Sequence, residues 1–175
     1  MLAVPLKQSL YAAYGDVIEA AGEADDANQG TAGRYNRLTP LVNLRSAPAA
    51  AGHPAASPNV CVFRSLPRAF PFECKLLERH LFSTQMFIPM NADRRYLVIV
   101  ALGGEKPDMS TLRCFIAAKN QGISYHPGVW HHPIIALDNT TDFTCVVNEN
   151  GSDDDCHIYP LPSPLKINPS PASKL

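Results

Sequence analysis

The sequence contains few charged residues and no long apolar run, and both shortages exclude classes of protein. Charged residues are 18% of the 175, and the net charge at neutral pH is −1. A chain without a basic surplus lacks the electrostatic footprint of a protein that binds nucleic acid or an anionic membrane. The longest apolar runs, such as residues 96–102, are too short to cross a bilayer. We therefore expect no nucleic-acid partner and no membrane partner.

The sequence also lacks a recognisable secretion leader and a disulfide pattern. Residues 1–7 show no basic segment followed by the apolar stretch and cleavage site of a signal peptide. The cysteines are odd in number and widely spaced, without the close pairs typical of a zinc ribbon or a redox motif. They are Cys61, Cys74, Cys114, Cys145 and Cys156. We expect reduced, buried thiols and a cytoplasmic protein.

Helix-forming segments are scarce, whereas short β-type runs punctuated by Pro and Gly are common. The runs are residues 60–63, 75–80, 85–88, 96–101, 112–116, 132–137 and 143–147. Many short strands with turns between them predict a sandwich or barrel rather than alternating helices and strands. A short helix is expected at residues 9–14, with Ser9 as its N-cap and Gly15 as its stop, and a helical turn within residues 107–112.

The length of the chain fits a single domain with a proper hydrophobic core. We expect this domain to span residues 1–161. Residues 45–59 are rich in Ala, Pro and Gly and are expected to form a surface loop. Residues 162–175 are rich in Pro and Ser, which predicts a C-terminal tail that is extended, partly disordered or laid over the barrel.

Three of the six histidines fall within seven residues, on either side of a turn. His126, His131 and His132 flank Pro127-Gly128, a pair that favours a tight turn. Imidazoles held together by such a turn suit metal binding or proton transfer near neutral pH. The alternative is a strand-end turn whose histidines point to solvent. Because side chains alternate along a strand, at most one of His131 and His132 is expected to line a cavity.

A second polar group precedes this turn in the chain. Glu78 and His80 are two residues apart and so share a strand face, and Gln85 follows them. With the Pro-Gly turn before His131, the pattern resembles the two metal-binding motifs of the cupin superfamily. Glu78 stands here for the first histidine of that pattern, and Gln85 for its glutamate. The resemblance implies a divalent ion such as Ni, Mn or Zn on Glu78, His80, Gln85 and His131, held less tightly than by three histidines.

Several longer stretches carry a closer resemblance. They are residues 13–19, 78–80, 84–90, 98–103, 106–113, 125–126, 129–133 and 141–143. In this order they resemble the ureidoglycolate lyase family, which also shows the Glu and Gln that depart from the general cupin pattern. The resemblance implies a mainly β fold, a cupin-like double-stranded β-helix barrel or jelly roll with a few short helices. It also implies a homodimer and the cleavage of (S)-ureidoglycolate to glyoxylate and urea in allantoin breakdown.

That reaction needs a base for the hydroxyl proton, an acid for the departing urea nitrogen and a cation for the carboxylate. Histidine suits both proton transfers near neutral pH. The candidates are His80, His126, His131 and His132. Arginine suits the carboxylate because its guanidinium donates two parallel hydrogen bonds. The substrate-binding candidates are Arg64, Arg34, Arg113 and Tyr125, although each arginine could instead be a surface charge or, for Arg113, part of an internal ion pair.

A bound metal would chelate the carboxylate and hydroxyl of the substrate and so lower the hydroxyl pKa. No nucleotide cofactor is expected, because residues 103–107 lack phosphate-binding spacing. Two rival functions stay open: an amidohydrolase that releases ammonia from ureidoglycolate, and a non-catalytic cupin-like small-molecule-binding protein. Trp130 is expected in the core or at its rim. The three aspartates at residues 153–155 are expected to form a solvated acidic turn.

Overall fold

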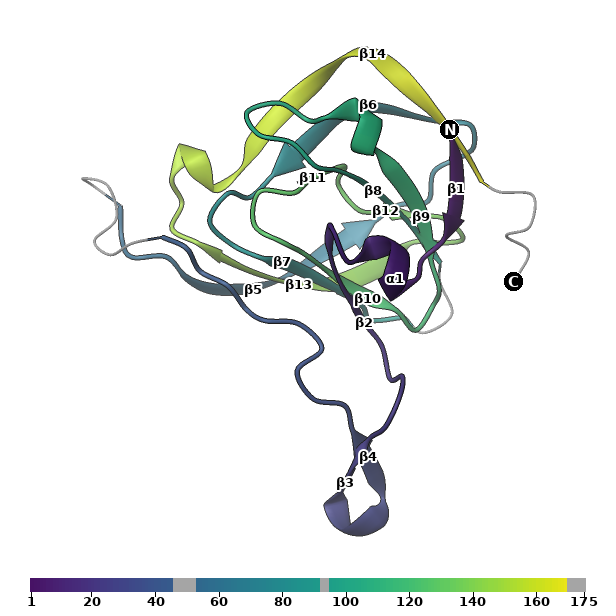
Figure 1. The fold of residues 1–175 in the computed structure, drawn as a ribbon, viewed down its shortest axis with the longest axis vertical. Helices are drawn as coiled ribbons and strands as arrows, with labels where there is room; N and C mark the ends of the chain where they lie inside the picture. Colours follow the sequence, from purple (N-terminus) through teal and green to yellow (C-terminus); the bar gives the residue numbers. More distant parts are fainter. Residues whose placement is uncertain (46–52, 92–94, 170–175) are drawn as a thin grey trace.

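Two β-sheets form the body of the molecule, and a β-hairpin projects from it (Figure 1). The computed structural model describes residues 1–45, 53–91 and 95–169. Strands make up 51% of the structure and helices 8%, so the mainly β fold predicted from the sequence is confirmed. Short runs of β-branched and aromatic residues between Pro and Gly account for this, because such residues favour pleated strands.

The larger sheet closes on itself. Its strand order is β11 (Trp130–His131), β6 (Phe72–Arg79), β14 (His157–Pro169), β1 (Leu2–Pro5), β9 (Arg113–Ala117), β8 (Tyr96–Ala101) and β12 (Ile135–Ala136). Because β11 also pairs with β8, all of these strands except β12 form a ring without a free edge. One apolar cluster takes side chains from every strand of the ring, among them Leu77, Ile99 and Trp130.

The smaller sheet is antiparallel and faces one side of the ring. Its order is β2 (Gly15–Ile18), β10 (Gly122–Tyr125), β7 (Gln85–Pro89), β13 (Thr141–Glu149) and β5 (Ser57–Ser65). A second apolar cluster fills the space between the sheets and includes Val98, Phe87 and Phe143. Strand β8 contributes alternate side chains to both clusters, which explains why it is buried along its whole length. Two sheets enclosing a core form the barrel that the resemblance implies.

The helices are short, and the first differs from its prediction. Helix α1 covers Gln8–Tyr11 and has Lys7, not Ser9, at its N-cap. Gly15 does not stop this helix; it lies in β2, where a Cβ atom would meet the Ser124 carbonyl oxygen at 1.8 Å. Close backbone contact therefore explains this glycine. Three 3₁₀ turns complete the set: η1 (Asn28–Gly30), η2 (Met109–Thr111), which confirms the turn predicted within residues 107–112, and η3 (Asp153–Asp155).

The projecting hairpin consists of β3 (Asp25–Ala27) and β4 (Ala32–Arg34), joined by η1. Figure 1 shows it at the bottom, beyond the smaller sheet and clear of the body. We call residues 23–38 the arm. After the arm, residues 39–45 return along the body: Thr39 Oγ1 donates to Asp16 Oδ2 at 3.0 Å, and the backbone N–H of Leu44 donates to Phe82 O at 2.6 Å.

More of the C-terminal region belongs to the barrel than the sequence predicted. Strand β14 runs to residue 169, and its residues Leu165 and Ile167 pair with Cys74 and Phe72. The expected boundary after residue 161 falls within this strand, at a register shift between Pro160 and Leu165 that accommodates the prolines. Residues 170–175, like residues 46–52 of the predicted loop, lie outside the described residues.

The strand predicted at residues 132–137 is largely absent, because only Ile135–Ala136 pairs as β12. Seven described strands were not predicted, and all except β14 have four residues or fewer: β1, β2, β3, β4, β10, β11 and β14. The five cysteines are free thiols, as expected. Among the described residues, no helix has the length and apolarity to span a membrane.

Candidate active site

A carboxylate and two imidazoles converge between the two sheets. Glu78 lies near the end of β6, His80 follows that strand directly, and His131 lies on β11. Strand pairing places His131 directly beside Glu78. One potential ligand atom from each residue lies within 4.8 Å of the others, and His131 Nε2 is 3.7 Å from Glu78 Oε1. The structure thus brings together three of the four residues proposed as metal ligands.

In each imidazole, one ring nitrogen contacts a backbone carbonyl group and the other has no hydrogen-bond partner among the described residues. His131 Nδ1 lies 2.9 Å from the Val129 carbonyl oxygen, and His80 Nδ1 lies 2.7 Å from the Asp155 carbonyl oxygen. Since a carbonyl oxygen only accepts, each Nδ1 carries the proton and donates it. Each Nε2 then bears a lone pair, and both are buried without a hydrogen-bond partner among the described residues. Buried polar atoms are rarely left unpaired, so these two atoms indicate a ligand.

Burial sets the charge of the cluster. It lowers the pKa of His131 to about 3, with a further decrease from the neighbouring His80, and it lowers the pKa of His80 as well. Both rings are therefore neutral at pH 7, the form that binds metal ions. Burial raises the pKa of Glu78, whose Oε2 lies 3.9 Å from the Cys156 thiol. A carboxyl with a raised pKa exchanges a proton more readily near neutral pH.

Tyr125 and Gln85 form the wall of the site on the smaller sheet. The Tyr125 ring stacks on His131 with centroids 4.0 Å apart and planes 8° apart. Gln85 pairs with Tyr125 across β7 and β10. The Gln85 Oε1 and the Tyr125 hydroxyl are both buried without a hydrogen-bond partner among the residues described. The donor set around the cluster, two imidazole nitrogens, a carboxylate and an amide oxygen, suits a divalent transition metal.

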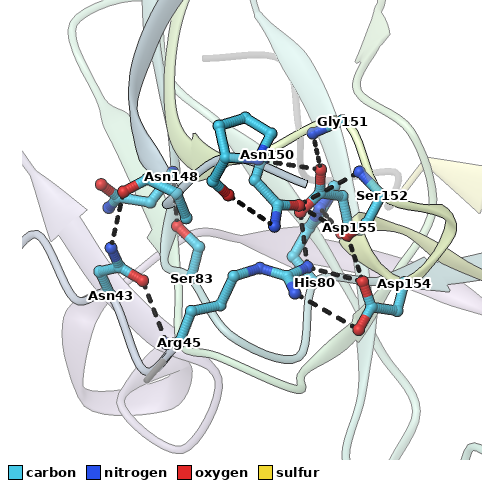
Figure 2. A network of polar contacts seen from close by, with 12 residues as sticks. Asn43, Arg45, His80, Ser83, Asn148, Asn150, Gly151, Ser152, Asp154 and Asp155 are labelled. Atoms are coloured by element: carbon cyan, nitrogen blue, oxygen red, sulfur yellow. Dashed lines mark hydrogen bonds and ion pairs between the residues drawn. The ribbon is translucent and has the colours of Figure 1, made fainter. Parts of the chain in front are cut away.

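A network of polar contacts holds the carbonyl group that orients His80 (Figure 2). Arg45 Nη2 lies 2.9 Å from Asp154 Oδ1 and 2.6 Å from Asp155 Oδ1. The other Asp155 oxygen accepts from the backbone N–H of Asn150 at 3.0 Å and of Gly151 at 2.6 Å. The expectation of a solvated acidic turn is therefore wrong for Asp155, whose side chain is only 14% exposed. We call Glu149, Asp154 and Asp155 the acidic rim, because they lie beside the cluster at the end of β13 and in η3.

The hydrogen bond from Arg45 lowers the pKa of Asp154 to about 2. A carboxyl with a lowered pKa stabilises the folded state above its ordinary pKa, here 3.8, and this contribution disappears as the pH falls toward 2. The Asp154 side chain is 48% exposed, so solvent screens the ion pair and the contribution is small. Arg45 serves mainly to fix the turn that contacts His80.

The other two candidate histidines lie outside the cluster. His132 lies on the opposite face from His131, as strand alternation predicts, with its ring edge-on to Phe72 at 5.2 Å. It lines a separate hollow of about 690 Å³ on the outside of the barrel. His126 follows β10, its side chain is 39% exposed, and its Nε2 is 3.7 Å from Asp16 Oδ2.

The three candidate arginines also lie away from the cluster. Arg64 is 72% exposed, pairs with Asp142 at 2.8 Å and lines the same outer hollow as His132. Arg113 donates to the carbonyl oxygens of Ser110 and Leu112. Arg34 is on the arm. Sequence reasoning missed Arg45 and Asp155, because no local pattern links residues 110 positions apart.

Trp130 lies in the core, as expected. Its side chain is 2% exposed, and its indole N–H donates to the Gly104 carbonyl oxygen at 3.2 Å. The Arg79 guanidinium lies over the ring at 4.4 Å. Trp130 and Arg79 therefore stabilise β11 and β6 on the face opposite to the cluster.

The fold and the site thus define a β-barrel protein with a buried cluster of two imidazoles and a carboxyl group between its sheets. Comparison with known proteins then identifies the family: residues 1–168 match the model of the ureidoglycolate lyases. A ureidoglycolate lyase of Salmonella typhimurium is 40% identical over 161 residues, 91% of this chain and 93% of the relative. One of Salmonella paratyphi B is 40% identical over 162 residues with the same coverage. The chain belongs to the ureidoglycolate lyase family, which confirms the resemblance seen in the sequence.

Likeness to solved structures is weaker. A dTDP sugar isomerase from Desulfovibrio desulfuricans is 15% identical with a TM-score of 0.43, over 69% of this chain and 81% of the other. The RmlC protein of Streptococcus suis, in complex with dTDP-D-xylose, is 14% identical with a TM-score of 0.37, over 57% and 47% of the two chains. Likenesses of this strength say nothing about the chemistry of this chain.

Proposed function

We propose that this protein cleaves (S)-ureidoglycolate to glyoxylate and urea, as a carbon–nitrogen lyase of allantoin breakdown. The observation that carries the proposal is the buried cluster of Glu78, His80 and His131 in a chain that belongs to the ureidoglycolate lyase family. In the reaction the hydroxyl group loses its proton and becomes the aldehyde oxygen of glyoxylate. The C–N bond breaks, and the urea nitrogen takes up a proton.

We assign the proton transfer to Glu78. Its pKa is raised by burial, and His80 and His131 are neutral rings already held by their Nδ1 protons. The Glu78 carboxylate accepts the hydroxyl proton, and the resulting carboxylic acid donates it to the departing urea nitrogen. One residue can perform both steps, because the substrate loses a proton at oxygen and gains one at nitrogen. A raised pKa brings the acid and base forms closer in free energy at neutral pH.

The residues around the cluster fit a divalent metal such as Mn, Ni or Zn. His80 Nε2 and His131 Nε2 would hold it, with Gln85 Oε1 as a further donor, and Glu78 beside them would stay free to transfer the proton. When bound, the ion would supply positive charge to the hydroxyl and carboxylate oxygens of the substrate. The carbonyl groups of Val129 and Asp155 keep both rings in the tautomer that this binding requires.

Glyoxylate release tests whether the protein is an enzyme or a binding protein. Purified protein incubated with (S)-ureidoglycolate should release glyoxylate, followed as its phenylhydrazone, at a rate proportional to protein concentration. The (R) enantiomer is the matched control and should react more slowly, because a chiral site holds only one hydroxyl beside Glu78. Binding of the substrate without glyoxylate release, with Mn, Ni and Zn each added in turn, would support a non-catalytic binding protein instead.

Removal of metal should abolish activity. Protein purified without chelators should contain about one divalent ion per chain, since the described residues offer one set of converging donors. Dialysis against a chelator should stop glyoxylate release, and Mn, Ni or Zn should restore it. Elemental analysis and the rate are measured on the same samples. Full activity in protein with less than about a tenth of an ion per chain would contradict a metal requirement.

Arg45→Met should weaken metal binding, because Arg45 fixes the turn whose carbonyl group orients His80. Loss of a partner that orients a metal ligand typically costs about 10- to 100-fold in affinity. Arg64→Met is the matched control, since it also removes an ion pair with an aspartate but lies on the outer hollow. Competition titrations with zinc measure both variants. Equal affinities would mean that Arg45 has no positioning role.

We further propose a cytoplasmic homodimer. The five free thiols suit a reducing compartment. Two features favour association of two copies, the projecting arm and an apolar outer face on the smaller sheet. Light scattering of the purified protein measures the assembly, and a mass near 38 kDa, twice the 19.0 kDa of one chain, is expected.

A further inference from the structure

Among the residues that the structure describes, the arginines of the body are not placed to bind the carboxylate of the substrate at the cluster. Four described arginines of the body make polar contacts away from the cluster. These contacts are Arg64 with Asp142, Arg79 with Gly104, Arg95 with Asp138, and Arg113 with backbone carbonyl groups. Arg45 lies beside the turn that orients His80, but its Nη atoms already bind two carboxylates of the acidic rim. The body of one chain therefore offers no uncommitted guanidinium beside Glu78 among the residues described.

The surroundings of His80 are also unfavourable for an anion. The Asp155 carbonyl oxygen lies 2.7 Å from His80 Nδ1, and the carboxylates of Asp154 and Asp155 share the single guanidinium of Arg45. Glu78 adds a third carboxyl group beside the imidazoles. A substrate with a carboxylate is repelled by such a surface unless further positive charge is present. A free guanidinium at the site would add the positive charge that favours the substrate assigned under the proposed function.

The arm carries cations without ion pairs. Arg34 and Arg37 are both exposed, and neither has a carboxylate partner within the described part of the chain. Asp25 lies opposite Arg34 in the hairpin, but its Oδ2 accepts a hydrogen bond from Asn36 Nδ2 at 2.5 Å. Arg34 lines two hollows, one of about 570 Å³ between the arm and residues 18–20 of the body, and one of about 630 Å³ lined by arm residues. Its guanidinium is therefore free to bind an anion.

The arm has a defined shape but little support from its own body. Strands β3 and β4 pack on each other and on η1, and Figure 1 shows the hairpin clear of the barrel. Its turn places Asn28, Gln29 and Gly30 at φ of 52°, 59° and 85°. Left-handed backbone at non-glycine residues persists where surroundings or function maintain it. A two-stranded hairpin alone is marginally stable in water, so this arm is expected to pack on another surface.

The outer face of the smaller sheet supplies a surface for a second copy of the chain. Its edge strand β5 exposes Val60 by 68% and Val62 by 59%, and the neighbouring strand segments expose Ile88 by 37%. Leu41, which follows the arm directly, is 59% exposed. Thr39, directly after the arm, contacts Asp16 on β2, the other edge strand of this sheet. A twofold axis at this face would use the same surface on both copies and extend each arm over its partner.

We propose that the active site is completed across a dimer, with Arg34 on the arm of one copy binding the substrate carboxylate in the site of the other. Arg34 donates two parallel hydrogen bonds to the carboxylate, while Glu78 of the other copy faces the hydroxyl. The arrangement is reciprocal, so each dimer has two composite sites. This inference rests on the proposed function for the identity of the anion.

Mixed dimers test the proposal. Arg34→Ala should lower kcat/KM about 10- to 100-fold, mainly through KM, as for loss of a hydrogen bond to a charged group. His131→Ala removes a cluster residue and is inactive. If Arg34 acts across the dimer, a chain with Arg34→Ala and a chain with His131→Ala form one intact site together. Random pairing of equal amounts makes about half of the dimers mixed, so activity should recover to about a quarter of the wild-type value.

The controls separate this proposal from the alternatives. Differently tagged chains allow mixed dimers to be isolated, and Arg34→Gln guards against a folding defect of the alanine variant. Arg37→Ala removes the same charge from the same arm and should leave kcat/KM within about threefold of wild type. No recovery in isolated mixed dimers, normal activity of Arg34→Ala, an equal loss in Arg37→Ala, or a monomeric wild type would overturn the proposal.

Failure of the proposed function would look different. A wild type that releases no glyoxylate contradicts the lyase assignment, whatever the variants do. In that case glyoxylate binding, measured by calorimetry, tests the arm without turnover. Dimeric wild type should bind glyoxylate at least about tenfold more tightly than Arg34→Ala does. Equal binding by the two proteins would overturn the role of Arg34.

Discussion

His131→Ala should lower kcat/KM by about 1,000-fold or more, because it removes an unpaired buried Nε2 that faces Glu78 and would hold the metal. The tyrosine ring that stacks on His131 would also lose its support. Glyoxylate release at substrate concentrations below KM gives kcat/KM directly. Circular dichroism and thermal unfolding check that the variant is folded, since truncation of a buried side chain costs about 1–3 kcal/mol.

The matched control is the neighbouring residue. His132→Ala removes the same side chain one position later, on the outer face against Phe72. Its kcat/KM should stay within about threefold of wild type, since surface changes seldom reach a buried site. A large loss in His132→Ala with normal activity in His131→Ala would place the active site in the outer hollow rather than between the sheets.

Glu78→Gln should lower kcat by about 100- to 10,000-fold, the range for loss of a general acid–base. The substitution keeps the size of the side chain, but it removes the group that accepts the hydroxyl proton. KM should change little, because Glu78 is not expected to bind the substrate in the ground state. Steady-state kinetics with matched metal loading, checked by elemental analysis, separate the two constants.

Asp142→Asn is the control for the change of a carboxyl to an amide. Asp142 pairs with the exposed Arg64 on the outside of the barrel and takes no part in the proposed proton transfer. It should leave kcat unchanged. Normal kcat in Glu78→Gln would mean that another group moves the proton, and the assignment of Glu78 would be abandoned.

Local patterns in the sequence predicted much of the barrel. Residues 96–101 form a strand because β-branched and aromatic residues favour the pleated backbone, and this prediction is met residue for residue by β8. Strand alternation likewise predicted that His131 and His132 face opposite sides. The resemblance to a family supplied Glu78 and Gln85 as site residues although they break the general cupin pattern.

The sequence could not predict contacts between distant segments. Glu78 lies beside His131 only because β6 pairs with β11, and strand pairing of this kind is set by the whole barrel. The Asp155 carbonyl group and Arg45 likewise lie at the site because the fold brings distant segments together. Neither segment carries a local signal of this role.

The sequence also could not predict which face of its strand Arg64 occupies. Arg64 shares its face of β5 with Val60 and Val62, which are exposed. Both faces of this strand are apolar, so alternation could not distinguish the inner face from the outer. An apolar outer face is itself informative, since it marks a surface that a partner covers.

The products of the wild-type reaction test the central claim most directly. Purified, metal-loaded protein is incubated with (S)-ureidoglycolate, and glyoxylate, urea and ammonia are measured in the same time course. A lyase that breaks the C–N bond beside Glu78 predicts equal amounts of glyoxylate and urea, with no ammonia above the background without protein. Ammonia in place of urea would contradict this account and identify the protein as an amidohydrolase.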